Sequence, residues 1–135
     1  MSDDASISRI LVGVDGSEAS RRALEWAATL GRDLDAEVVA VHAAGLIERL
    51  DADSSHEAFE REWCAPLDAV QVRNRRLVVD GPPPLVMLRV AEQEDVDLIV
   101  VGTRGMGGEA AQILGSTSRH LVEHAAVPVT VLHAR

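Results

Sequence analysis

The sequence predicts one α/β domain over residues 1–135, with a five-stranded parallel sheet and helices on both of its faces. Three observations support this prediction. Short runs of β-branched and aliphatic residues alternate with segments of helical periodicity, a pattern typical of βαβ units. The apolar runs are unbroken, as in strands that are buried on both faces. The chain is 47% hydrophobic, and no internal repeat or linker divides it.

The first strand and helix form a βα unit. After a polar lead-in over residues 1–8, which we expect to be flexible, the run Ile10–Val14 is predicted as a strand. Ser17 is a suitable N-cap for the following helix. A second strand is predicted over Glu37–Ala43. The residues that recur at helical steps in this first helix are Ala19, Ala23, Trp26, Ala27 and Leu30.

The middle of the chain is less regular. We expect a loop over residues 44–55 and a helix over His56–Leu67 that ends near Pro66. Gln71–Val79 is predicted as a third strand. Because its first half, VRNRR, is too polar for the centre of a sheet, we expect this strand to lie at an edge.

The second half of the chain returns to alternating strand and helix. Asp80–Pro84 is predicted as a turn, with Pro84 in the first turn of a helix that runs to Glu94. The remaining predicted elements are a fourth strand over Val96–Val101, a helix over Ser116–Ala125 and a last strand over Pro128–His133.

A glycine-rich stretch follows the fourth strand. Two residues separate Gly102 from Gly105, and nine more separate Gly105 from Gly115 and Ser116. Glycine lets backbone N–H groups crowd around an anion, and a helix N-terminus adds unpaired donors and the positive end of its dipole. The spacing therefore predicts a phosphate cradle. It is not a Walker loop, because all 13 basic residues are arginine, nor a dinucleotide GxGxxG, which follows the first strand.

The predicted topology places Asp15 near this stretch. If the first and fourth strands are central neighbours, their carboxyl ends form the crevice in which such sheets bind ligands. Asp15 follows the first strand and Gly102 follows the fourth, so the two loops would meet at one pocket. Asp15 either contacts a ligand or metal there or only closes the turn. Arg104 either clamps a phosphate bidentately or extends into solvent.

Composition excludes several classes of partner. The formal net charge of −9 argues against a nucleic acid or an anionic membrane, because both are met by basic patches. Cys64 is the single cysteine, so no internal disulfide forms and we expect a packed, inert thiol. The chain has no signal-peptide h-region and no run of eighteen apolar residues, so the cytoplasm is the expected compartment.

The histidines admit functional and structural interpretations. His120, Glu123 and His124 spell HxxEH, the signature of an inverted zinc protease motif, but such a site needs a third ligand and a catalytic pocket. We therefore favour the interpretation that His120 and His124 are ordinary surface histidines. We expect His42 and His133, at strand ends, to be partly buried with a backbone hydrogen bond.

Four features carry a resemblance to a known family. They are ILVGVDGSEAS at Ile10–Ser20, VGTRGMGG after the fourth strand, the glycine spacing, and the closing VPVTVLH. Together they resemble the universal stress protein family, over nearly the whole chain and most strongly at residues 9–43 and 77–133. The spacing G-two-G-nine-G-Ser/Thr is similar to that of the ATP-binding branch. The resemblance implies a strand order of 3-2-1-4-5.

The resemblance also implies roles for individual residues. Asp15 would meet the ribose, or a Mg²⁺ or Mn²⁺ ion that accompanies the nucleotide, with Gly13 beside it. Ala43 would offer its backbone to the adenine. The positions implied to line the ribose and phosphates are Val101, Gly102 and Gly105, and those implied to hold the triphosphate are Gly115, Ser116 and Thr117.

The function implied is that of a cytoplasmic homodimer that binds ATP or another adenine nucleotide and regulates a stress response, paired through Val129–His133. We expect little or no catalysis, at most a slow ATPase, because no lysine, general base or water-positioning glutamine is evident near the loop. Two alternatives remain open. One is an interaction protein of the same fold that binds no nucleotide, because Glu109 would repel phosphates. The other is a slow ATP hydrolase.

Overall fold

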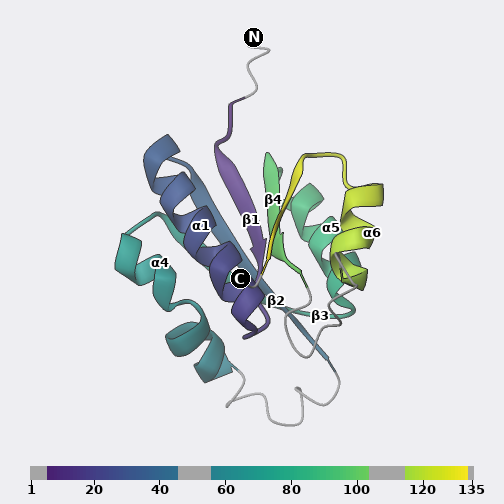
Figure 1. Cartoon of the computed structure of the whole chain (residues 1–135), viewed down its shortest axis with the longest axis horizontal. Coiled ribbons are helices and arrows are strands. Elements are labelled where there is room, and N and C mark those ends of the chain that lie inside the picture. The colour runs from purple at the N-terminus through teal and green to yellow at the C-terminus, as the bar shows by residue number, and fades with distance from the viewer. Residues whose placement is uncertain (1–5, 46–55, 104–114, 134–135) are drawn as a thin grey trace.

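The computed structural model describes residues 6–45, 56–103 and 115–133, and Figure 1 shows their arrangement. Five parallel strands form one sheet in the order β3-β2-β1-β4-β5. The parallel sheet, its order and the edge position of the third strand are therefore confirmed. The strands are β1 Arg9–Gly13, β2 Glu37–Ala44, β3 Asn74–Asp80, β4 Leu98–Gly102 and β5 Val129–Leu132.

Helices cover both faces of the sheet (Figure 1). On one face lie α1 (Glu18–Leu34), the π-helical turn η1 (Phe59–Trp63) and α4 (Ala65–Val70). On the other lie α5 (Pro83–Gln93) and α6 (Ser116–His124). Each face has its own apolar core, because successive side chains of a strand point to opposite faces. Among the described helices, none is long and apolar enough to cross a membrane.

The first helix begins as predicted. The hydroxyl of Ser17 accepts a hydrogen bond from the backbone N–H of Ser20 at 3.2 Å, which satisfies one of the unpaired donors of the first turn. The prediction for Trp26 is wrong, because its side chain is 40% exposed. The buried stripe runs through Ala23, Leu24, Ala27 and Ala28, and Trp26 lies beside it.

The middle helix differs from the prediction. The helical segment that starts at His56 breaks at Cys64, and α4 then begins at Ala65. Pro66 lies in the first turn of α4, where its missing N–H costs nothing, instead of ending a helix. Gln71 ends α4 with a φ of 62°, so β3 starts at Asn74 and not at Gln71.

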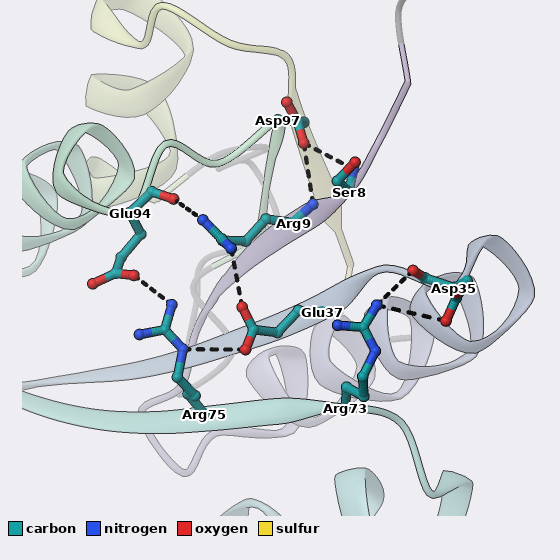
Figure 2. A network of polar contacts seen from close by, with 8 residues as sticks. All are labelled: Ser8, Arg9, Asp35, Glu37, Arg73, Arg75, Glu94 and Asp97. Atoms are coloured by element: carbon teal, nitrogen blue, oxygen red, sulfur yellow. Dashed lines mark hydrogen bonds and ion pairs between the residues drawn. The ribbon is translucent and has the colours of Figure 1, made fainter.

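A network of ion pairs joins the strands at the end of the sheet where β1 and β2 begin (Figure 2). The carboxylate of Glu37 accepts hydrogen bonds from the guanidinium groups of Arg9 at 2.9 Å and Arg75 at 3.2 Å. Arg75 also pairs with Glu94, which raises the pKa of the Arg75 guanidinium. Asp97 accepts from the backbone N–H of Arg9 at 3.1 Å. Arg75, one of the arginines that make the third strand too polar for a sheet centre, thus serves this network.

Candidate functional site

A cavity of about 120 Å³ opens at the carboxyl ends of β1, β2 and β4. It lies where the strand order reverses, because β1 has β2 on one side and β4 on the other. Open α/β sheets bind ligands at this position. The predicted site residues that line the cavity are Gly13, Asp15, Ala43, Val101, Gly102 and Thr117.

The other predicted positions do not line the cavity or are not described. Gly115 is the buried N-cap of α6, and Ser116 is exposed at its start. No side chain of the described residues caps this helix, so its first N–H groups depend on another acceptor. Arg104 and Gly105 lie outside the described residues, as does Glu109.

Gly102 joins three elements at the edge of the cavity. A Cβ at this position would lie 2.5 Å from the carbonyl carbon and oxygen of Ala19, in the first turn of α1. The carbonyl oxygen of Gly102 accepts a hydrogen bond from the hydroxyl of Ser118 in α6 at 3.0 Å. Glycine at the end of β4 is therefore required by close helix–strand packing, whether or not a ligand binds.

Gly13 faces α5 from the end of β1. A Cβ here would lie 3.1 Å from the sulfur of Met87 and 3.6 Å from a methyl group of Val101. Met87 and Pro83 also line the cavity, and the sequence analysis missed both. The proline-rich turn Asp80–Pro84 was the available signal for Pro83, since it starts a helix at the ligand-binding end of the sheet. No sequence signal marks Met87, whose position depends on how α5 packs.

Asp15 has a structural role and also faces the cavity. One carboxylate oxygen, Oδ1, accepts a hydrogen bond from the backbone N–H of Ser17 at 2.9 Å, forming an Asx turn that leads into α1. Asp15 is exposed and lines the cavity, and Oδ2 accepts no hydrogen bond from the described residues. Among the described residues no group of three or more His, Cys, Asp or Glu could hold a metal ion.

His42 also lines the cavity, although its sequence context predicts a structural role only. Its side chain is buried, and Nδ1 lies 2.9 Å from the carbonyl oxygen of Val14, so Nδ1 donates the hydrogen bond. Its ring lies edge-on to Trp63, with centroids 5.1 Å apart. The expectation of burial with a backbone hydrogen bond is confirmed for His42. The expectation of partial burial is wrong for His133, which is exposed.

The HxxEH pattern does not form a catalytic zinc site in the described part of the chain. His120, Glu123 and His124 lie on α6 and do not line the cavity. No third ligand joins the two histidines there. The surface interpretation agrees with the exposure of His124 and the partial burial of His120.

The chain is similar to proteins of one family. The model of the universal stress protein family matches residues 6–133. A universal stress protein of Thermus aquaticus is 30% identical over 132 residues, which cover 91% of this chain and 96% of that protein. A universal stress protein of Mycobacterium tuberculosis is 30% identical over 144 residues, covering 92% of this chain and 94% of the relative.

Solved structures share the fold. A universal stress protein in complex with cAMP superposes with a TM-score of 0.80 at 24% identity, covering 96% and 99% of the two chains. One from Archaeoglobus fulgidus in complex with dAMP has a TM-score of 0.73 at 23% identity, with 94% and 98% covered. One from Arabidopsis thaliana with AMP bound has a TM-score of 0.69 at 21% identity, with 93% and 91% covered. The match of the family model over most of the chain shows that this protein belongs to the universal stress protein family.

Proposed function

We propose that this protein binds an adenine nucleotide, with ATP as the ligand, in the cavity at the ends of β1, β2 and β4. The observation that carries the proposal is the convergence of Gly13 and Gly102 on the switch point of the sheet, next to a helix with no side-chain cap. An anion at the start of α6 would pair the N–H groups that no described side chain meets. The solved neighbours with cAMP, dAMP and AMP support the adenine class.

The lining of the cavity suits the two ends of a nucleotide differently. Val41, Ala43 and Met87 make one side apolar, which suits the faces of a base, and the backbone of Ala43 supplies polar groups for its edge. Gly102, Thr103 and Thr117 make the other side polar. This side leads to the start of α6, where the phosphates would lie.

A divalent cation would complete the site. Asp15 has one carboxylate oxygen with no hydrogen bond from the described residues, which leaves it able to coordinate Mg²⁺ or Mn²⁺ together with phosphate oxygens. One carboxylate plus substrate phosphates is a usual arrangement for Mg²⁺. No lysine or arginine is among the described residues that line the cavity, so the cation and backbone N–H groups would carry much of the charge compensation there.

We further propose that the protein acts as a cytoplasmic homodimer whose regulatory state depends on bound nucleotide. The four residues of β5 are all only partly buried in the single chain, and this strand lies at an edge of the sheet. An uncovered edge offers unpaired backbone groups to a second copy across a two-fold axis. Light scattering at micromolar concentration tests the homodimer, and a monomeric mass would refute it.

A second candidate function is an interaction protein of the same fold with no nucleotide. Two observations favour it. Asp15 closes a turn through Ser17, and Gly102 is required by its contact with Ala19, so both residues have structural reasons to be present. On this alternative the residues of the cavity serve the fold alone.

Mass spectrometry of small molecules released from the denatured protein separates the two candidates. An adenine nucleotide at close to one per chain supports the first. If the purified protein releases no nucleotide, calorimetric titration with ATP, AMP and cAMP, each with and without Mg²⁺, measures binding instead. No released nucleotide and no heat of binding at millimolar ligand would favour the interaction protein.

A further inference from the structure

Two histidine rings lie against each other on α6. His120 and His124 are four residues apart, so their side chains share one face of the helix. Their ring centroids are 4.4 Å apart, and the ring planes are inclined by 39°. His124 is exposed and His120 is partly buried, so solvent reaches the pair. Neither residue lines the cavity assigned to the nucleotide.

We propose that His120 and His124 form a two-imidazole site for a divalent transition-metal ion such as Cu²⁺, Ni²⁺ or Zn²⁺. A metal bound to two imidazole nitrogens at about 2.0–2.1 Å needs those nitrogens roughly 3 Å apart. Rings with centroids 4.4 Å apart meet this requirement after small side-chain rotations. Imidazole suits zinc, copper and nickel, whereas carboxylate, carbonyl and water oxygens suit magnesium and calcium.

The site has two protein ligands and open positions. No third His, Cys, Asp or Glu of the described residues joins the pair, so the remaining positions of the ion would be open to water. Geometry therefore imposes little selectivity, and the affinities follow the general order in which Cu²⁺ binds more tightly than Ni²⁺ or Zn²⁺. The net charge of −9 favours any cation at this surface.

Binding at this pair depends on the helix. The two rings are adjacent only because one helical turn separates the residues, so an ion chelated by both binds folded α6 better than an unfolded chain. Addition of the metal should therefore raise the melting temperature of the protein. This effect does not require nucleotide, so it can be measured on the empty protein.

The test is a titration of the tag-free chain with Cu²⁺ alone. Calorimetry measures the binding, and electron paramagnetic resonance identifies the ligands of the ion. We expect one ion per chain with hyperfine splitting from two nitrogens. His124→Ala should weaken Cu²⁺ binding at least about tenfold and leave the splitting of one nitrogen in the spectrum. Mutation of a residue that only hydrogen-bonds to a metal ligand already lowers metal affinity about 10- to 100-fold, and His124 would be a ligand itself. His120→Ala should do the same.

Matched controls are His56→Ala and His133→Ala, which remove exposed histidines elsewhere. These variants should bind Cu²⁺ as the unchanged chain does. Because His120 is partly buried, circular dichroism must establish that its variant folds, and the exposed His124 decides the matter if it does not. Wild-type affinity in His124→Ala, or equal weakening by the two controls, would overturn the proposal.

Discussion

Gly102 lies so close to Ala19 that a methyl group on Gly102 would come within 2.5 Å of the Ala19 carbonyl carbon and oxygen. The contact joins the last residue of β4 to the first turn of α1, beside the candidate site. Because the atoms that would be met belong to the backbone, the clash cannot be relieved by a side-chain rotation.

Gly102→Ala should therefore destabilise the protein even when no nucleotide is present. We expect a loss of about 1–3 kcal/mol in the free energy of unfolding, the usual cost of overpacking a well-packed site. Urea denaturation of the variant measures it. Thr103→Ala, a change at the next and partly exposed position, is the control and should stay within about 0.5 kcal/mol. An unchanged urea midpoint for Gly102→Ala would contradict the packing argument.

The sheet could be predicted from sequence because its strands are local and unbroken. Ile10 to Val12 and Leu98 to Val101 are apolar at every position, and both strands are buried on both faces. The polar start of the third strand predicted its edge position for a sound reason, since Arg75 pairs with carboxylates at the border of the sheet. The start of α1 followed from one hydroxyl at Ser17.

The errors came from residues whose role depends on tertiary packing. Pro66 is compatible with either end of a helix, and it lies in the first turn of α4 between Cys64 and Leu67, which are both buried. Met87 joins the site only because α5 packs over Gly13. The glycine spacing marked the candidate site, but Gly102 also has a packing role that spacing cannot reveal.

Gly13 and Met87 should be coupled in both stability and binding. An alanine at residue 13 would place Cβ 3.1 Å from a flexible thioether, which can move. We expect Gly13→Ala to cost less than about 1.5 kcal/mol of stability and to weaken nucleotide binding about tenfold, because the methyl group enters the cavity.

A double-mutant cycle with Met87→Ala measures this coupling. Removal of the thioether should reduce the stability cost of Gly13→Ala, since the nearest contact is gone. Additive changes in the free energy of unfolding would show that the two side chains do not interact. Leu85→Ala, an exposed change on the same helix, serves as the control for α5.

Cys64 should make the protein less stable at alkaline pH. Burial raises the pKa of its thiol from the ordinary value of 9.0 to about 12. The unfolded chain therefore releases this proton near pH 9 while the folded chain still holds it, so the stabilising contribution is present below pH 9 and is lost as the pH rises toward 12. Urea midpoints from pH 8 to 11 should fall more steeply for the unchanged chain than for Cys64→Ala.

Thiol labelling gives an independent readout of the same burial. At pH 8 the native Cys64 should react with a thiol reagent only on the timescale of opening, because the reactive thiolate is scarce and covered. Addition of urea should restore a rate typical of a free cysteine. Rapid labelling of the native protein would show that the thiol is accessible.

Glu37 should stabilise the amino-terminal end of the sheet in a salt-dependent way. Its carboxylate is 18% exposed and pairs with both Arg9 and Arg75. Glu37→Gln should lower the free energy of unfolding by about 1 kcal/mol at low ionic strength. The loss should be smaller in roughly 0.5 M salt, because salt screens the ion pairs. Asp33→Asn removes the exposed pair with Arg32 and should change little. Loss of nucleotide affinity in Glu37→Gln would be unexpected, because the network lies at the opposite end of the strands from the cavity.

Asp15→Asn should separate the two roles of this residue. Asparagine retains an oxygen that can accept from the backbone N–H of Ser17, so the turn into α1 should persist and the free energy of unfolding should change by less than about 0.5 kcal/mol. The negative charge that would coordinate a cation is lost. We therefore expect the affinity for ATP to become nearly independent of Mg²⁺, as measured by calorimetry at fixed ionic strength.

Asp15→Ala, which also removes the turn acceptor, should in addition lower the free energy of unfolding by about 1 kcal/mol. An Asp15→Asn protein that keeps the full Mg²⁺ dependence would place the cation on other ligands and leave Asp15 with the turn alone.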